Sequence, residues 1–145
     1  MFRNQYDNDV TVFSPQGRLF QVEYALEAVK QGAPCVAVIS DRHAVVAGLK
    51  RSPGDLSASA AKKLFSLAPH VGCAIAGLTS DARVLTKSMQ KQAQGELLNL
   101  ERRVPVARLV KDVAADRAQQ STQYYGGRPF GVGLLIVGVD ETGPH

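Results

Sequence analysis

Four apolar residues recur every three or four positions near the start of the chain: Leu19, Val22, Leu26 and Val29. Polar side chains fill most positions between them, so the pattern predicts an amphipathic helix. Ser14 can cap the first amides of this helix, and Pro15 suits its first position because proline has no N–H to leave unpaired there. The expected helix therefore begins at Pro15, and Gly32 is expected to supply a left-handed residue after its last turn.

Short apolar runs rich in β-branched residues follow this helix. Residues 34–40 and 44–50 are separated by three polar residues and predict an antiparallel hairpin. Since both runs are almost continuously apolar, we expect this strand pair to be covered on both faces. Residues 51–59 read as a polar connection, and residues 63–67 and 71–78 predict a second strand pair.

The helical spacing then returns twice. Thr79, Ser80 or Asp81 can cap a long helix, and Pro105 opens a second one. Residues 132–139 read as a further strand. Strand pairs grouped apart from the helices indicate an α+β fold and not an alternating parallel sheet. The side chains expected to face the core are Ala82, Leu85, Met89, Ala93 and Leu97 in the long helix and Val106, Leu109, Val110 and Val113 in the second.

The composition is that of an ordinary globular domain. Of 145 residues, 45% are apolar and 21% are charged, so neither disorder nor a fibrous repeat is indicated. The formal charge is +4, from 17 Lys and Arg against 13 Asp and Glu. A solvated helix face is favoured over a nucleic-acid patch, because no aromatic residues interleave the basic ones. The basic residues that come closest to a cluster are Arg102, Arg103, Arg108 and Lys111.

The two cysteines, Cys35 and Cys73, lie inside apolar runs, which is typical of buried thiols in a reducing compartment. The polar start of the chain does not resemble a signal peptide, and no apolar run has the length of a membrane span. We therefore expect a soluble intracellular protein that contacts no membrane.

The chain carries no recognisable catalytic or metal-binding motif. Its two Ser-x-x-Lys matches lack the companion elements of the penicillin-binding enzymes. His43, His70 and His145 have no Cys or carboxylate at metal-ligand spacing, so we expect neither a metal nor a cofactor.

Residues 6–29, YDNDVTVFSPQGRLFQVEYALEAV, resemble the amino-terminal signature of alpha-type subunits of the 20S proteasome. The resemblance implies an N-terminal nucleophile hydrolase-like fold, a four-layer αββα sandwich with two antiparallel sheets between helix layers. Residues 1–12 would be an amino-terminal gate tail. Residues 13–145 would be an alpha-type domain that lacks its C-terminal part.

The same resemblance implies a non-catalytic subunit of a heteroheptameric alpha ring, whose tail helps to close the entry pore for ubiquitin- and ATP-linked degradation. Its partners would be other alpha subunits, beta-ring subunits and the C-terminal tails of activators such as the regulatory particle, in cytoplasm and nucleus. In this fold the nucleophile is a Thr, Ser or Cys at the mature amino terminus, whereas this chain begins Met1-Phe2. An amidohydrolase unmasked by cleavage before Cys73 is the alternative, and a free basic binding module is a third possibility.

Site residues follow from the resemblance position by position. An open-gate cluster would comprise Tyr6, Asp7, Pro15 and Tyr24. A pocket for activator tails would be lined by Gly32, Lys63 and Leu78, with Lys62 as a competitor for the role of Lys63. An annulus loop around the pore would comprise Tyr124, Tyr125, Gly126 and Gly127. Asn8 departs from the Arg that many relatives carry after Tyr-Asp, which removes a cation from the gate cluster.

Overall fold

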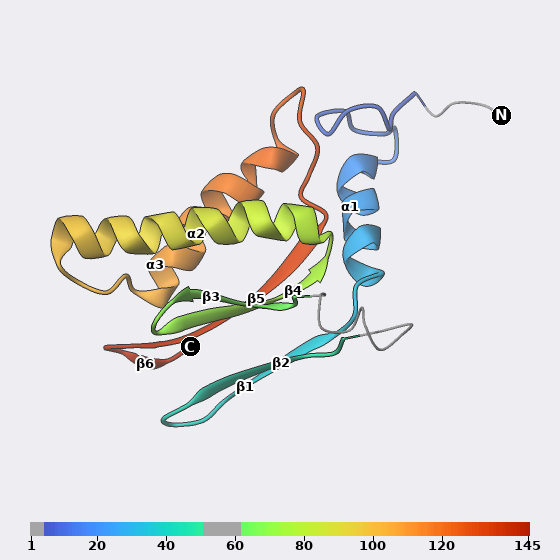
Figure 1. Cartoon of the computed structure of the whole chain (residues 1–145). Coiled ribbons are helices and arrows are strands. Elements are labelled where there is room, and N and C mark those ends of the chain that lie inside the picture. The colour runs from blue at the N-terminus through green and yellow to red at the C-terminus, as the bar shows by residue number, and fades with distance from the viewer. Residues whose placement is uncertain (1–4, 51–61) are drawn as a thin grey trace.

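The computed structural model describes residues 5–50 and 62–145, and within them six strands form two antiparallel sheets (Figure 1). The predicted connection at residues 51–59 and the first four residues of the predicted tail lie outside the described residues. The elements in chain order are α1 (Phe20–Lys30), β1 (Cys35–Ile39), β2 (Ala44–Gly48), β3 (Leu64–Ala68), β4 (Val71–Gly77), α2 (Thr79–Leu100), α3 (Val106–Val110), the π-helical segment η1 (Lys111–Ala118), the 3-10 turn η2 (Gln120–Thr122), β5 (Val132–Asp140) and β6 (Gly143–Pro144).

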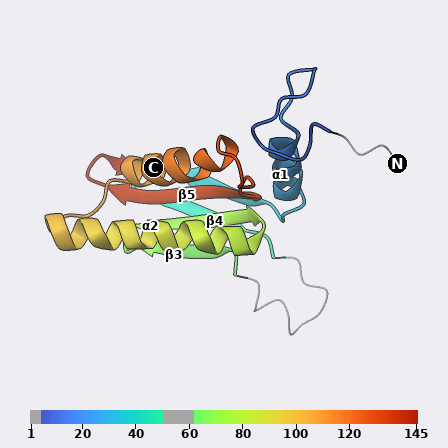
Figure 2. The same cartoon turned by 90° about the horizontal axis from the view of Figure 1, so that it is seen from above.

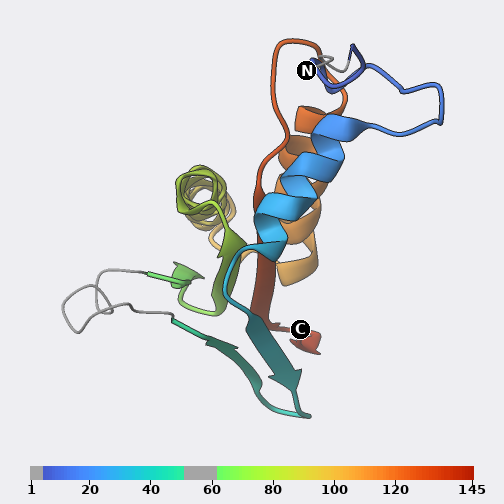
Figure 3. The same cartoon turned by 90° about the vertical axis from the view of Figure 1, so that its right-hand side faces the viewer.

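The elements stack in three layers. Strands β3, β4, β5 and β6 form the central sheet in that order, and β1 pairs with β2 in a separate hairpin. The helices α2, α3 and η1 cover one face of the central sheet, and the hairpin lies against the other face (Figures 1 and 3). Seen from above, α2 runs along β3 and β4, and the later helices lie over β5 (Figure 2). The expected α+β class is therefore confirmed.

The alternation of side chains on β4 explains how one strand serves both layers. Val71, Cys73 and Ile75 are at most 3% exposed and belong to the core beneath the helices. Because neighbouring residues of a strand point to opposite faces, Gly72 and Ala74 lie on the face turned toward the hairpin. Small side chains on that face let the two sheets approach each other closely. The remaining members of the core are Leu67, Ala82, Leu85, Met89, Ala93, Val104, Val106, Leu109 and Val113.

The first helix begins later than its sequence predicts. Ser14 caps a tight turn instead of the helix: its Oγ accepts a hydrogen bond from the Arg18 amide at 3.1 Å. Gly17 in this turn has a φ of +77°, which is not a helical value. A helix that began at Pro15 could therefore not continue through Gly17. Serine, proline and glycine favour turns as strongly as helix ends, so local sequence left two solutions. The α-helix starts only at Phe20, with Leu19 as its cap residue.

The expected left-handed residue after α1 is also wrong. Among the described residues, Gly32 is not one of the glycines with positive φ. A glycine is required there for another reason, because a Cβ on Gly32 would lie 2.4 Å from the backbone nitrogen of Gly77. The end of α1 and the end of β4 therefore touch through their backbones.

Two burial predictions fail, one for Leu97 and one for the outer face of the hairpin. Leu97 is exposed because the 22 residues of α2 extend ~33 Å, well past the five-residue strand β3 beneath it. Leu26 is also exposed, and no residue of α1 is fully buried. The hairpin is covered on one face only: no described residue covers its outer face, where Val36, Val38 and Val45 are exposed. A continuous apolar run therefore does not show that both faces of a strand pair are buried, because both faces of this hairpin are apolar and only one is packed against described residues.

Candidate functional site

A cavity of about 280 Å³ opens where the end of α1 meets β4 and the start of α2. Three lysines line it, and no acidic side chain among the residues that the structure describes does so. The Lys63 ammonium donates a hydrogen bond to the carbonyl of Ala33. The Lys62 ammonium lies 5.1 Å from the centre of the Phe65 ring, within the range of a cation–π contact. The described residues that line it are Gln31, Gly32, Ala33, Lys50, Lys62, Lys63, Ile75, Gly77 and Thr79.

Three glycines make this junction possible. Gly77 has φ of +109°, and a Cβ there would lie 2.3 Å from the carbonyl oxygen of Gly131. A Cβ on Gly131 would in turn lie 2.8 Å from the side chain of Leu78. Together with Gly32, these residues let α1, β4 and the start of β5 cross at backbone distance. The part of the cavity wall formed by Gly32 and Gly77 is consequently main chain and tolerates little displacement.

The residues predicted for the activator pocket are only partly gathered here. Gly32 and Lys63 line the cavity, whereas Leu78 does not. Leu78 is instead tied to the next strand, because its amide donates to the Gly131 carbonyl at 2.9 Å. Sequence reasoning missed Lys50 and Thr79. Their positions just after β2 and at the first residue of α2 were visible, but nothing in the local pattern placed them beside Lys63.

An ion pair between a buried carboxylate and an exposed arginine holds the segment that leads into β5. Asp81, in the first turn of α2, is 5% exposed, and its two carboxylate oxygens each accept a 2.7 Å hydrogen bond from the Arg128 guanidinium. Asp81 also accepts from the Gly131 amide at 2.9 Å. These bonds, led by those from Arg128, lower the pKa of Asp81 despite its burial. Sequence reasoning treated Asp81 only as a possible helix cap and did not find this pair.

The predicted gate residues are partly brought together. The Tyr24 hydroxyl donates to the Asp7 carboxylate at 3.3 Å, and Gln21 donates to the Asp7 carbonyl. Partial burial, followed by the nearby negative charge of Asp7, raises the pKa of Tyr24. Tyr6 is 40% exposed, and Pro15 lies in the exposed turn that precedes α1. The tail therefore lies on the first half of α1 through Asp7.

The predicted annulus loop lies beside the tail, as Figures 1 and 3 show. Tyr124 and Tyr125 are exposed, and Gly126 has φ of +87°. The pKa of Asp9 is lowered mainly by hydrogen bonds from Thr11, and the Gly126 amide adds to the effect. A Cβ on Gly126 or Gly127 would meet no atom within 4 Å, so both glycines lie in open space.

The tail itself is anchored. Val10 is 1% exposed although it lies within the predicted tail. A hydrophobic residue buried inside a polar segment holds that segment against the domain. Residues 5–12 are consequently docked at Asp7 and Val10; between these points Asn8 is exposed and Asp9 is half-buried.

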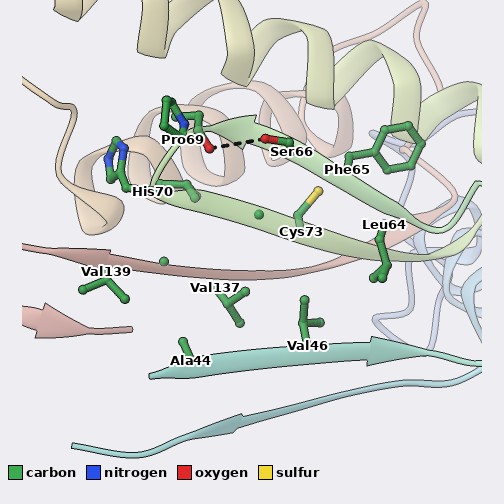
Figure 4. A pocket seen from close by; sticks show the side chains of 14 residues that line it. Ala44, Val46, Leu64, Phe65, Ser66, Pro69, His70, Cys73, Val137 and Val139 are labelled. Atoms are coloured by element: carbon green, nitrogen blue, oxygen red, sulfur yellow. Dashed lines mark hydrogen bonds between the residues drawn. The ribbon is translucent and has the colours of Figure 1, made fainter. Parts of the chain in front are cut away.

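A second cavity, of about 550 Å³, lies between β2 and the central sheet (Figure 4). Cys73 belongs to its lining, but Figure 4 shows the sulfur on the opposite side, toward the helices. Burial raises the pKa of the Cys73 thiol to about 11. A protonated thiol buried in apolar surroundings is a poor nucleophile, so this geometry does not favour the amidohydrolase alternative.

Several charged residues have structural partners. Arg108 pairs with the buried carboxylate of Glu96 at 2.8 Å, and Arg102 lies 3.5 Å from it. The basic residues near the start of α3 are thus partly neutralised, which does not favour a nucleic-acid patch.

The His70 ring forms a hydrogen bond with the Val104 carbonyl at 2.8 Å, and the His145 ring lies 3.0 Å from the Asp140 carboxylate. No group of His, Cys, Asp and Glu among the described residues could hold a metal ion.

None of the helices in the described part of the chain is long and apolar enough to cross a membrane.

Two family models match this sequence over adjacent ranges. One, described as Proteasome subunit, covers residues 29–145. The other describes the N-terminal signature of A-type proteasome subunits and covers residues 6–28. The range of the second lies within the segment that carried the resemblance in the sequence.

Similar proteins come from several eukaryotes. The chain is 54% identical to a probable alpha type-6 proteasome subunit of Schizosaccharomyces pombe, 50% identical to the alpha type-1 proteasome subunit of Caenorhabditis elegans and 50% identical to the alpha type-6 proteasome subunit of Saccharomyces cerevisiae. Each match covers all 145 residues of this chain but only 53%, 55% and 61% of the relative. Alpha type-1, the subunit type that the first eight residues resemble, is one of the names that occur among these matches.

Proposed function

Since the chain belongs to the proteasome subunit family as an alpha-type member, we propose that it is a non-catalytic structural and gating subunit of the 20S alpha ring. Its tail would close the entry pore and its lysine-lined cavity would receive the C-terminal tail of an activator. Its partners would be other alpha subunits, beta-ring subunits and activators in ubiquitin- and ATP-linked degradation, in cytoplasm and nucleus. The described layers agree with the N-terminal nucleophile hydrolase-like fold of this family, although they comprise three layers of the expected four.

The geometry of α1 is the observation that carries the gating proposal. Its first half holds the tail through the hydrogen bond from Tyr24 to Asp7. Its last turn leads directly into Gln31 and Gly32, which line the lysine-rich cavity. A single helix of 11 residues therefore connects the tail to the cavity. A ligand that shifts the end of this rigid element would also move the tail, which supports a coupled gate.

The cavity suits the end of a peptide chain. An ammonium group in a concave, partly desolvated site attracts a carboxylate more strongly than one on an open surface does. Lys63 has its ammonium at the cavity and fixed against the Ala33 carbonyl. The terminal carboxylate of an activator tail would replace or share this contact.

Deletion of residues 2–12 tests the gate in an assembled particle that contains this subunit. We expect basal hydrolysis of short peptides to rise, because the segment docked through Asp7 and Val10 is removed. The control is Asp41→Asn, an exposed substitution in the turn between β1 and β2. Unchanged hydrolysis would contradict a closing role for this tail.

Lys63→Ala tests the cavity. Activator binding should weaken while the particle still assembles, because the side chain reaches the cavity and not the core. Lys87→Ala is the matched control, since Lys87 is an exposed lysine on α2 outside the cavity lining. Activator affinity that is the same in both variants would remove Lys63 from the proposed site.

A further inference from the structure

The cavity at the end of α1 carries more positive charge than one carboxylate requires. Lys50, Lys62 and Lys63 line it, and none of the described lining residues is acidic. The amino terminus of α2 adds to this field, because Thr79 is the first residue of the helix and also lines the cavity. No side chain caps that terminus, and its helix-dipole charge of about half a positive charge is offset in part by the Asp81 carboxylate in the first turn, which is itself paired with Arg128.

The three ammonium groups are not equivalent. Lys63 already donates to the Ala33 carbonyl, and Lys62 lies over the Phe65 ring. Within the described residues, the Lys50 ammonium has neither a hydrogen-bond nor an ion-pair partner. Its backbone is nevertheless held in place, because the adjacent Leu49 amide donates to the Pro34 carbonyl at 3.0 Å. The main chain beside Lys50 is therefore fixed, and no described residue compensates the charge of its exposed side chain.

The size of the cavity limits which ligand could neutralise the positive charge of its lysines. About 280 Å³ is at the small end of ligand sites, which start near ~300 Å³. The site therefore admits the end of a chain and not a long segment. A single terminal carboxylate would neutralise only one of the three lysines, so charge complementarity favours an occupant with a second negative group close to the first.

Resting on the proposed function, we propose that this cavity selects peptide C-termini that carry a Glu or Asp side chain within the last four residues. Lys63 binds the terminal carboxylate, and Lys50 binds the side-chain carboxylate. Lys50 is then a specificity-determining residue, because it discriminates among tails that all have a terminal carboxylate. The Lys50 pair is partly exposed to solvent, so the expected preference for Glu over Gln is modest, roughly fivefold.

Fluorescent seven-residue peptides test this proposal against the assembled particle. A single Glu, or a Gln in its place, is moved through the last four positions, and each peptide is made with a free carboxylate and with a terminal amide. Affinity is measured by fluorescence anisotropy for the wild type, Lys50→Met, Lys63→Met and the exposed control Lys87→Met. Lys50 and Lys87 are both exposed, so neither substitution removes a buried side chain.

The wild type and Lys87→Met should prefer Glu over Gln at one position by roughly fivefold, and this preference should shrink as salt is added. Lys50→Met should abolish that preference while keeping the discrimination between carboxylate and amide. Lys63→Met should lose the latter. A Glu preference that persists in Lys50→Met, or its absence from the wild type, overturns the role of Lys50 alone. Peptide binding that ignores the terminal carboxylate, or no binding at all, overturns the docking function itself and this inference with it.

Discussion

Asp81→Asn offers the sharpest test of how the segment before β5 is held. The substitution keeps the size of the side chain and one oxygen that can accept from the Gly131 amide. It removes the carboxylate that accepts two 2.7 Å hydrogen bonds from Arg128. The amide nitrogen of Asn cannot accept from a guanidinium, so one of the two bonds from Arg128 is lost, and the other reaches a neutral oxygen in place of a carboxylate.

The size of the effect follows from the surroundings of the two partners. Hydrogen bonds to charged groups contribute about 1.5–3 kcal/mol to stability. The Asp81 side chain is buried, but the Arg128 side chain is 60% exposed and can return to water when its partner is lost. We therefore expect the lower part of that range, about 2 kcal/mol for local opening. At 1.4 kcal/mol per factor of ten, this corresponds to roughly 30-fold faster opening-limited hydrogen exchange.

Hydrogen exchange measured by mass spectrometry on residues 124–131 of the assembled particle reports this opening. The Gly131 amide is the most direct reporter, because it donates to Asp81. Asp41→Asn serves as the control, being a charge-neutralising change in an exposed turn. Equal exchange in this segment for the wild type and Asp81→Asn would refute the assignment of the pair as its anchor.

The pH dependence has a definite sign. Hydrogen bonds from Arg128, and secondarily from the Gly131 amide, lower the pKa of Asp81 in the folded chain. Folding therefore favours the ionised form, and the contribution is fully present above the unfolded pKa of about 3.9. It is lost as the pH falls below that value toward the lowered folded pKa. Stability of the wild type relative to Asp81→Asn should be constant from pH 7 to 5 and decrease only in more acidic solution.

Three further predictions concern the packing that surrounds the candidate site. Gly77→Ala should destabilise the fold by more than about 3 kcal/mol, because it combines backbone strain with a Cβ 2.3 Å from the Gly131 carbonyl. Gly17→Ala is the control: Gly17 also has a positive φ but faces open space, so its substitution should cost only about 1 kcal/mol. Equal urea midpoints for the two variants would contradict this reasoning. Leu85→Ala should cost about 3 kcal/mol in the same urea titration, since Leu85 is 2% exposed in the core beneath α2, and a loss below 1 kcal/mol would show that the core is loosely packed there. Native Cys73 should react with iodoacetamide far more slowly at pH 8 than the urea-unfolded chain does, because burial raises its pKa to about 11, and rapid native alkylation would contradict its burial.

Much of the fold was predictable from short-range pattern. The two hairpins, the long helix α2 and the strand β5 all lie where apolar periodicity places them. The inward residues of α2 are buried from Ala82 to Ala93, since a helix over a sheet must bury one stripe. The signature at residues 6–29 also identified the family, because literal residue identity carries information that periodicity does not.

The sequence predictions were wrong at two kinds of position. At one kind, the same residues suit two local conformations, and at the other, burial depends on which layer of the fold packs against them. Ser14, Pro15 and Gly17 suit either a helix start or a turn, and the turn was formed. The outer face of the hairpin is as apolar as the inner one, so its sequence could not show that only one face is packed in the described structure.

The sequence by itself thus determined the class, the family and the main buried stripes, because these depend on residues within a few positions of one another. Only the tertiary structure decided the site. Lys50 meets Lys63 around one cavity, Arg128 reaches back to Asp81, and Gly32 touches Gly77. Each of these pairs joins different elements of the fold. No local preference encodes such contacts, because they form only when the packing of the core brings those elements together.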